Sequence, residues 1–347
     1  MVKKAIFDKK NILVIGGAGF IGSFLCDELV KTSKVICIDN YISGRIENIE
    51  HLLGNANFIF IKHDAAEPID LEKFPELDKF KIKFQGVQEV YNLACPTIKK
   101  DFEKNIVNTL LANSKVVYNS LEVARTYQAK YLLASSSSVY GNPLAGQEEM
   151  TEDYWGFVDP VGLRSCYNEG KRFAEAFTIN YGRQYNLETK IARIFNTYGP
   201  RMRLNSGRMI PDFVQSAANN QAVVIYGDGS EQDSYCYVAD IIDGLIKFMT
   251  ASKTGVINFG GAEKYRIIDI ANSIIQLTDS HSNIKFDAKL PFIIRAGRAN
   301  ITKAKTELSW IPVTNLATGL KKTVDDMLGS RVLSYASVMN NLTNNES

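Results

Sequence analysis

The chain of 347 residues has few cysteines, few histidines and no long apolar segment. Its five cysteines are widely spaced without a C-x-x-C pair and it has only three histidines, so we expect neither a disulfide framework nor a metal site. No apolar run approaches the roughly 20 residues that a membrane span needs. The first residues mix basic, apolar and acidic side chains without the pattern of a signal peptide. We therefore expect a cytoplasmic protein without a membrane partner.

An excess of charge of one sign is also missing. Lys and Arg number 40 against 38 Asp and Glu, which leaves a net charge of +2 at neutral pH. A surface that binds a polyanion needs a larger positive excess, so nucleic acid is not an expected partner. With 45% hydrophobic and 22% charged residues, the composition is that of a globular protein with one large core or two modest ones.

What the sequence does contain is an alternation of short apolar runs and helical segments. The expected strands span residues 11–15, 34–38, 57–61, 89–93, 131–134 and 189–194. The expected helices span residues 20–31, 105–126 and 166–185. Runs that are apolar on both faces are typical of buried parallel strands. The alternation therefore predicts an α/β fold with a doubly wound parallel sheet.

Three glycines at intervals of three, Gly16, Gly19 and Gly22, lie between the first expected strand and its helix. Without Cβ atoms they allow a tight turn and the close approach of a pyrophosphate to backbone N–H groups, although a glycine-rich segment alone can be only a turn. Asp39 ends the next strand, where a carboxylate accepts the ribose hydroxyls and repels a 2′-phosphate. The pattern predicts a Rossmann fold that binds NAD in preference to NADP, a preference that the nearby Arg45 weakens.

The second half of the chain alternates less regularly than the first, so we expect the chain to divide into two parts. Residues 1–195, together with about 223–251, are expected to form the dinucleotide-binding domain. Residues 196–222 and 252–330 are expected to form a smaller substrate-binding portion, and residues 331–347 a polar tail. In open α/β sheets a ligand binds at the carboxyl ends of the strands, so the cleft between the two parts is the expected site.

A second constellation is Tyr167 and Lys171, four residues apart at the start of an expected helix. One helical turn places both on the same face, and a neighbouring ammonium favours the phenolate form of a tyrosine. Such a pair also occurs by chance on many helices. Ser136, in a serine run directly after an expected strand, adds a hydroxyl at the strand's carboxyl end. We therefore expect Ser136, Tyr167 and Lys171 to converge beside a nicotinamide.

These motifs resemble the extended short-chain dehydrogenase/reductase family that acts on nucleotide sugars. The resemblance covers about residues 11–327, and further matching segments are 194–201, 226–230, 237–240 and 301–305. The branch that it resembles most by motif is the UDP-glucuronate decarboxylases, through residues 164–172 and 205–208.

The resemblance implies NAD as cofactor, a nucleotide-diphosphate sugar as substrate, and oxidation of a sugar hydroxyl, usually at C4. The implied cofactor site is Gly16, Gly19, Phe20, Ile21, Gly22, Asp39, Asn40, Asp64, Leu93 and Lys171. The implied catalytic residues are Ser136, Tyr167 and Lys171, with Ser138 beside them. The implied substrate residues are Asn196, Arg208, Tyr226 and Arg298.

Some of these residues have a structural alternative. Asp64 could equally cap a helix, and Asn196 could cap only the following turn. Arg208 and Arg298 could be solvated loop residues.

Two positions depart from the decarboxylase pattern. The decarboxylases carry a Glu where this chain has Ser138, and the serine run here looks like that of the 4-epimerases. The family usually has an Arg, which meets the diphosphate or the sugar acid, where this chain has Asp233. Two carboxylates about 4 Å apart repel by roughly 1–4 kcal/mol, depending on the local dielectric. An arginine from the loop after Pro200 (Arg201, Arg203 or Arg208) could compensate.

The expected net reaction is therefore 4-epimerisation or 4-oxidation through a 4-keto sugar. UDP-glucuronate decarboxylation is the alternative, and a protein that binds NAD or a sugar nucleotide without catalysis is the alternative of another class. The helices expected at 105–126 and 166–185 each carry a second apolar stripe. With the family's usual pairing, these stripes predict a homodimer through a four-helix bundle.

Overall fold

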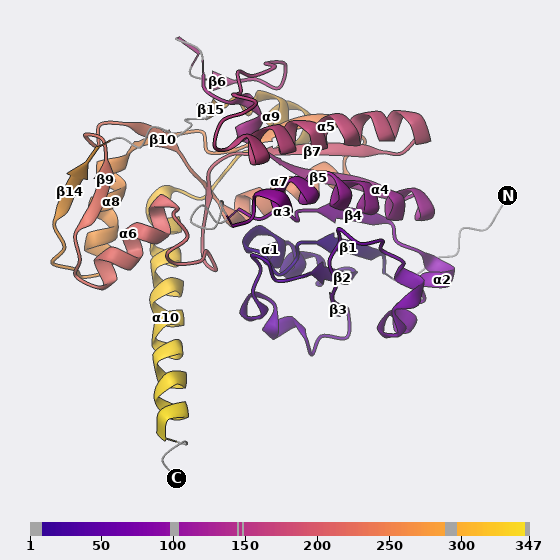
Figure 1. Cartoon of the computed structure of the whole chain (residues 1–347), viewed down its shortest axis with the longest axis horizontal. Helices are drawn as coiled ribbons and strands as arrows, with labels where there is room; N and C mark the ends of the chain where they lie inside the picture. The colour runs from indigo at the N-terminus through magenta and orange to yellow at the C-terminus, as the bar shows by residue number, and fades with distance from the viewer. Residues whose placement is uncertain (1–8, 98–103, 144–145, 148, 289–296, 344–347) are drawn as a thin grey trace.

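Figure 1 shows a computed structural model of the chain, which describes residues 9–97, 104–143, 146–147, 149–288 and 297–343. A central sheet of seven parallel strands has the order β12-β7-β5-β4-β1-β2-β3. The strands are β1 (Asn11–Ile15), β2 (Lys34–Asp39), β3 (Phe58–Lys62), β4 (Glu89–Asn92), β5 (Lys130–Ser136), β7 (Thr189–Ile194) and β12 (Gly255–Phe259). The predicted doubly wound parallel sheet is confirmed.

The strand order reverses between β1 and β4. The chain runs outward through β2 and β3 and then returns to pair β4 with the other edge of β1. The N–H of Gly16 donates to the Ile38 carbonyl at 2.8 Å, and the N–H of Leu93 donates to the Ile15 carbonyl at 2.9 Å. The loops after β1 and β4 therefore leave the sheet side by side, at the point where the strand order reverses. In open α/β sheets, ligands bind at such a switch point.

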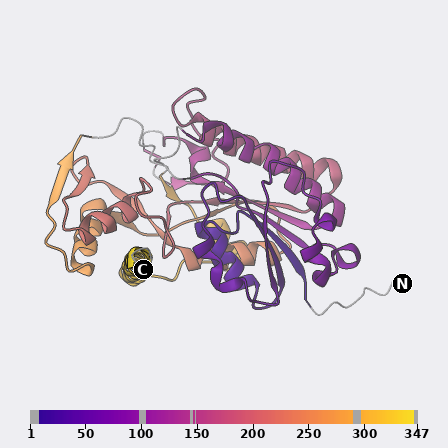
Figure 2. The ribbon, with the colours of Figure 1, turned by 60° about the horizontal axis from the view of Figure 1, so that its bottom comes forward.

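Helices cover both faces of this sheet (Figure 2). They are α1 (Phe20–Leu29), α2 (Ile82–Gln85), α3 (Ile106–Ala112), α4 (Lys115–Tyr127), α5 (Ser165–Tyr185), α7 (Val238–Thr250) and α9 (Thr302–Leu308). Short 3-10 helices are η1 (Ile46–Asn48), η2 (Glu50–Leu52), η3 (Leu71–Lys73), η4 (Pro75–Phe80) and η6 (Ser137–Tyr140).

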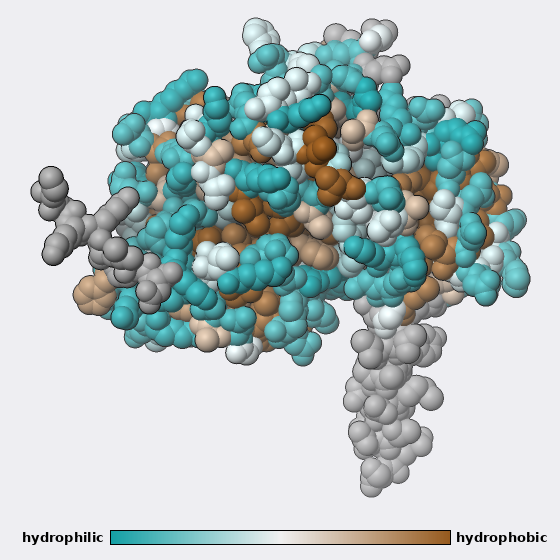
Figure 3. Space-filling model, turned by 180° about the vertical axis from the view of Figure 1, so that it is seen from behind, coloured by the Kyte–Doolittle hydropathy of each residue, from teal (hydrophilic) through white to brown (hydrophobic). Residues whose placement is uncertain are grey.

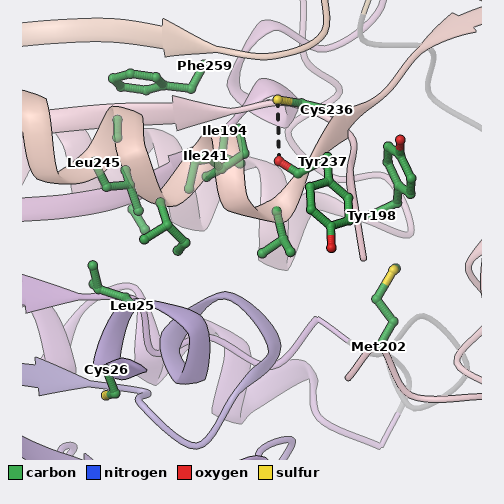
Figure 4. Close-up of a cluster of buried hydrophobic side chains, with 14 of the residues drawn as sticks. Leu25, Cys26, Ile194, Tyr198, Met202, Cys236, Tyr237, Ile241, Leu245 and Phe259 are labelled. Atoms are coloured by element: carbon green, nitrogen blue, oxygen red, sulfur yellow. Dashed lines mark hydrogen bonds between the residues drawn. The ribbon is translucent and has the colours of Figure 1, made fainter. Parts of the chain in front are cut away.

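Successive side chains of β1 point to opposite faces, as the period of a strand requires. Ile12 and Val14 belong to a cluster with side chains of α1 and α7, and Leu13 and Ile15 to a cluster with side chains of α4 and α5. Figure 4 shows part of the first cluster, with Leu245 on α7 between Phe259 at the sheet and Leu25 on α1. The same cluster extends to Tyr198 and Met202, so this core continues toward the substrate side of the molecule.

A small lobe packs beside the carboxyl ends of the strands (Figure 1). It consists of α6 (Met209–Ala218), α8 (Ile267–Leu277), the parallel pair β9 (Val223–Tyr226) and β14 (Ile284–Asp287), and the antiparallel pair β10 (Gln232–Ser234) and β13 (Lys264–Arg266). Two further parallel pairs are β8 (Thr197–Tyr198) with β11 (Cys236–Tyr237), and β6 (Glu149–Met150) with β15 (Arg298–Ala299). The last helix, α10 (Leu316–Thr343), packs against α6 and α8 and then extends away from the body (Figure 1).

The course of the chain differs from the division expected from the sequence. β12 extends the central sheet and α9 packs on it, although residues 252–330 were expected outside that domain. β9 pairs within the small lobe, although residues 223–251 were expected in the sheet domain. The reason is that the chain crosses between the two parts repeatedly. Phe259 is fully buried against Trp310, with ring centroids 5.0 Å apart, so β12 completes the core of the larger part.

Two further expectations are corrected. The helix expected at 105–126 is two helices, because Asn113 and Ser114 interrupt it. The Asn113 side chain donates to the Thr109 carbonyl at 2.8 Å and the Ser114 hydroxyl donates to the Leu110 carbonyl at 2.7 Å, and such bonds compete with the helical pattern. The polar tail expected from residue 331 is not a separate segment, because α10 runs through this position to Thr343. Residues 344–347 lie outside the described residues.

The surface seen from behind is mostly hydrophilic, with apolar side chains in separate groups (Figure 3). Among the described helices, none has the length and apolar character that crossing a membrane requires.

Candidate active site

A cavity of about 1420 Å³ lies at the carboxyl ends of the strands and reaches the small lobe. Its volume exceeds the roughly 300–1,000 Å³ typical of a site for one small ligand, so it has room for a dinucleotide and a second ligand. The structure brings all the residues singled out from the sequence to its wall. They are Gly16, Gly19, Phe20, Ile21, Gly22, Asp39, Asn40, Asp64, Leu93, Ser136, Ser138, Tyr167, Lys171, Asn196, Arg208, Tyr226 and Arg298.

The glycine loop after β1 is too crowded for larger residues. Gly16 has a φ of +80°, and a Cβ there would lie 2.7 Å from the backbone nitrogen of Ala94. A Cβ on Gly22 would lie 2.2 Å from the carbonyl oxygen of Gly16. α1 begins directly after Gly19, and no side chain caps its first turn. The first N–H groups of the helix thus lie in the cavity wall as donors for an anion such as a pyrophosphate.

Asp39 at the end of β2 is a fixed carboxylate, with 8% of its surface exposed. Its Oδ2 accepts from the N–H of Ala18 at 3.0 Å and its Oδ1 from the N–H of Tyr41 at 2.8 Å. Burial raises the pKa of Asp39, while the N–H groups of Tyr41 and Ala18 lower it. Gly44 passes so close that a Cβ there would lie 2.9 Å from both carboxylate oxygens. Asp39 lines the cavity, where a carboxylate fits a ribose diol.

Two other residues of the cofactor half also stabilise turns. Asn40 accepts from the N–H of Ile42 at 3.1 Å, and Asp64 accepts from the N–H of Ala66 at 2.9 Å. Asp64 therefore stabilises a turn and lines the cavity, and it does not cap a helix, because no helix follows it before Leu71.

Ser136, Tyr167 and Lys171 line the same cavity. β5 ends at Ser136, and the first turns of α5 carry Tyr167 and Lys171. The Lys171 side chain is only 4% exposed, and its Nζ donates to the Ala134 carbonyl at 2.8 Å and lies 6.0 Å from the centre of the Tyr167 ring. The buried ammonium is thereby held under the phenol rather than in solvent. A hydroxyl, a phenol and an ammonium in this order can hold a substrate hydroxyl and move its proton.

Ser138 lies two residues beyond Ser136 in the cavity wall. Its N–H donates to the Ser136 hydroxyl at 3.2 Å, and the residue is 8% exposed. Its own hydroxyl oxygen is buried and has no hydrogen-bond partner among the described residues. A buried hydroxyl without a partner costs about 1–3 kcal/mol, so this group is available to a ligand.

Next to Ser136 lies a buried polar network that the sequence analysis missed. The Ser135 hydroxyl donates to Glu175 Oε1 at 2.5 Å, and Arg193 donates to both oxygens of Glu175, the shorter bond being 2.7 Å. Arg193 also donates to the Tyr140 hydroxyl at 2.9 Å. The network joins β5, α5 and β7 directly beneath Ser136. An arginine inside the apolar strand 189–194 was the available signal, because a charge in a buried strand requires a partner.

Arg164 is a second residue that the sequence analysis left without a role. It precedes α5 and lines the cavity together with Arg208. Burial lowers the pKa of both guanidinium groups, and the proximity of Tyr167 raises it. Arg164 lowers the pKa of Arg208 further, so the two positive charges are close to each other and to the phenol. The signal in the sequence was the position of Arg164, three residues before Tyr167.

The predicted substrate residues make specific contacts. The Asn196 amide donates to Asp233 Oδ2 at 2.8 Å, and Asp233 Oδ1 accepts from the N–H of Ser234 at 2.8 Å. Arg298 is not a solvated loop residue, because it pairs with Glu149 and donates to the Ala262 carbonyl at 3.0 Å. Tyr226 ends β9 with its side chain half-exposed at the cavity.

The three arginines considered as compensation for the missing family arginine differ in position. All three line the cavity, but Arg201 pairs with Asp27 on α1 at 2.7 Å, and Arg203 is exposed. Arg208 lines the cavity and donates to the Thr97 carbonyl at 3.4 Å, with no carboxylate partner among the described residues. Arg208 is therefore the positive charge best placed for a substrate anion.

Comparison with known proteins agrees with this geometry. The model of the NAD dependent epimerase/dehydratase family matches residues 12–260. A relative in Arabidopsis thaliana, UDP-glucuronic acid decarboxylase 2, is 40% identical over 317 residues, which cover 91% of this chain and 68% of the relative.

Two solved structures are similar throughout. An epimerase of Methanothermobacter thermautotrophicus has a TM-score of 0.82 and 26% identity, with 95% of this chain and 96% of that chain covered. The UDP-glucuronic acid 4-epimerase of Bacillus cereus, in complex with UDP-glucuronic acid and NAD, has a TM-score of 0.80 and 28% identity, with 92% and 99% covered.

Proposed function

The chain belongs to the NAD dependent epimerase/dehydratase family, and from this premise we propose that it oxidises C4 of a nucleotide-linked sugar and keeps all the sugar's carbon atoms, with 4-epimerisation as the net reaction. It is an NAD-dependent enzyme of the short-chain dehydrogenase/reductase type. The observation that carries the proposal is the meeting of Ser136, Tyr167 and Lys171 in a cavity whose wall has Ser138 and Asp233 in place of the residues typical of decarboxylases.

In the proposed mechanism, Tyr167 removes the proton from the sugar O4. The Ser136 hydroxyl holds that oxygen, and the buried Lys171 ammonium stabilises the phenolate that takes part in the transfer. NAD, when bound, would supply the hydride acceptor for C4. The N-terminus of α1 would hold its pyrophosphate, and Asp39 would accept hydrogen bonds from its ribose hydroxyls. Return of the hydrogen to the other face of the 4-keto sugar gives the epimer, and release of that sugar gives net oxidation.

Retention of carbon is argued from two positions. Ser138 has a neutral hydroxyl where the decarboxylases carry a carboxylate, so it supplies no acid-base group for the loss of C6. Asp233 is a carboxylate that two N–H donors hold at the cavity wall. The carboxylate of a sugar acid would lie near the like charge of Asp233 in a partly closed site. Two such charges are costly unless a positive group pairs with them.

The alternative is decarboxylation of UDP-glucuronate, the activity in the name of the relative that is 40% identical. Arg164 and Arg208 are the observation in its favour, because two guanidinium groups beside Tyr167 could hold a sugar carboxylate. The same pair also suits a diphosphate, which every nucleotide-linked sugar carries. The positive charge therefore does not separate the two reactions, whereas Ser138 and Asp233 do.

The proposed function is tested by incubating the protein with NAD and, in turn, UDP-glucose, UDP-N-acetylglucosamine, UDP-glucuronate and dTDP-glucose. We expect at least one to give its 4-epimer by nuclear magnetic resonance, with its mass unchanged. Accumulation of NADH absorbance in proportion to a 4-keto product would identify a dehydrogenase instead. Binding of a nucleotide sugar without conversion of any of them would overturn the proposal in favour of a binding protein.

We also propose that the enzyme is a homodimer through the helices α3, α4 and α5. Val107 on α3 is 65% exposed, Phe173 on α5 is 53% exposed, and Tyr118 on α4 is 46% exposed. Apolar side chains this exposed on neighbouring helices favour cover by a second copy in a four-helix bundle. Light scattering at micromolar concentration should give twice the mass of the chain, and Phe173→Glu should shift it toward one chain. A single-chain mass for the parent protein would reject the dimer.

A further inference from the structure

Arg201 lies where three parts of the molecule meet. It follows Pro200 in the loop that leads from β8 to α6, and its φ of +63° is in the left-handed region. A residue other than glycine rarely adopts this backbone conformation. The conformation persists where surrounding contacts hold the residue in place. Both the guanidinium and the backbone of Arg201 make such contacts.

The guanidinium of Arg201 is bound to α1, the helix whose first turn faces the cofactor. Nη2 pairs with Asp27 at 2.7 Å and Nη1 donates to the Ser23 hydroxyl at 3.2 Å. The guanidinium carbon also lies 4.4 Å from the centre of the Phe24 ring. Three side chains on one face of α1 therefore hold a single arginine from the substrate side of the cavity.

The backbone of Arg201 extends the link in two directions. Its N–H donates to Asp326 Oδ2 on α10 at 2.9 Å, and α10 packs against the small lobe. Its carbonyl accepts from Arg45 Nη2 at 3.3 Å. The N–H of Arg45 in turn donates to the carbonyl of Ala18 at 3.0 Å, and the N–H of Ala18 donates to Asp39. The connection thus runs from the small lobe to the carboxylate of the ribose site.

The same loop ends in the substrate half of the cavity. Arg208, seven residues after Arg201, lines the cavity near Tyr167. Ser206 is buried, lines the same cavity, and has a hydroxyl oxygen without a partner among the described residues. A shift of the loop at Arg201 would therefore move groups that face the substrate, while a shift of α1 would move groups that face the cofactor.

From this geometry we propose that Arg201 is a positioning residue that couples the two halves of the cavity, so that NAD and the nucleotide sugar each strengthen the binding of the other. The inference rests on the proposed function in one respect, namely that the substrate half takes a nucleotide diphosphate. Arg201 also lines the cavity, and in this scheme it acts through α1 and the loop rather than through a bond to either ligand. Its bonds hold α1 and the loop that carries Arg208 in a fixed relative position. Coupling of this kind is reciprocal and typically amounts to about 5- to 150-fold in affinity.

The test is a binding cycle that does not depend on turnover. The dissociation constant of NAD is measured by calorimetry on cofactor-free protein, with and without saturating UDP as the probe, for the parent, Arg201→Met and Asp27→Asn. We expect UDP to tighten NAD binding about tenfold in the parent, and this ratio to fall to near one in both variants. Asp27→Asn keeps the side-chain volume and removes the charge that pairs with Arg201, so it serves if Arg201→Met does not fold. Asp27 also contacts His51 at 2.7 Å, and His51→Gln, which removes only that second contact, should keep the parental ratio.

Glu28→Gln is the matched control, since it removes the neighbouring carboxylate of α1, whose partner Lys31 lies on the same helix. It should leave the ratio as in the parent. A parent whose NAD affinity is unchanged by UDP, or variants that keep the full ratio, would overturn the coupling role. Because the experiment measures equilibrium binding, neither result decides whether the protein catalyses the proposed reaction.

Discussion

The two halves of the cavity are built from different parts of the backbone. The cofactor half consists of the ends of parallel strands, a glycine loop and one helix terminus, and its contacts come largely from the main chain. The proposed substrate half consists of side chains on loops, the short helix η6 and a two-stranded sheet, namely Ser138, Asn196, Arg208 and Asp233. A few substitutions can change the substrate half without disturbing the sheet. The comparison suggests that the oxidation step is fixed by the fold, while the net reaction is decided by a few loop residues.

The largest expected effect is at the junction of the halves. Tyr167→Phe should lower turnover by about 10²–10⁴-fold, because it removes the group that moves the O4 proton. NAD should still bind as in the parent, since the phenol is assigned to the sugar. Turnover with the substrate found in the panel and the amount of NAD bound per chain measure the two effects separately. A variant with near-parental turnover would refute the assignment of Tyr167.

In the cofactor half, Gly22→Ala should weaken NAD binding. The new Cβ would lie 2.2 Å from the carbonyl oxygen of Gly16, so the loop must move away from its position under the pyrophosphate. Overpacking typically costs about 1–3 kcal/mol, or roughly 5- to 150-fold in affinity. Gly54→Ala is the control, because no atom lies within 4 Å of its added Cβ. Equal NAD affinities for the two variants would show that the loop does not hold the cofactor.

A smaller effect is expected from the charge of Asp39. Burial raises its pKa in the folded protein, and ribose hydroxyls donate better to the carboxylate than to the acid. NAD affinity should therefore fall as the pH drops through this raised pKa. The fall should occur at a higher pH than for an aspartate with an ordinary pKa. Without NAD the sign is opposite, since a raised folded-state pKa means that stability is lost as the pH rises through it. Calorimetry across acidic pH should show the decrease for the parent and none for Asp39→Asn. An affinity independent of pH in the parent would remove Asp39 from the ribose site.

The two halves also differed in how far the sequence predicted them. The strands, the glycine loop and Asp39 follow from local patterns, because apolar runs and glycine spacing directly reflect a parallel sheet and its first turn. The partners of Arg193 and Arg201 could not be predicted, since they lie far away in the sequence. Glu175 and Asp27 reach them only through the packing of helices on the sheet. The break at Asn113 was missed because its side chain competes for a helical carbonyl, which apolar spacing does not reveal.

The central claim, that Ser138 and Asp233 prevent the loss of carbon, is tested most directly with UDP-glucuronate. The protein is incubated with NAD and this sugar nucleotide, and the products are weighed by mass spectrometry beside those of the double variant Ser138→Glu/Asp233→Arg. We predict that the parent releases no CO2 and forms no UDP-pentose, and that the double variant begins to form one. A UDP-pentose from the parent protein would contradict the claim and identify the enzyme as a decarboxylase.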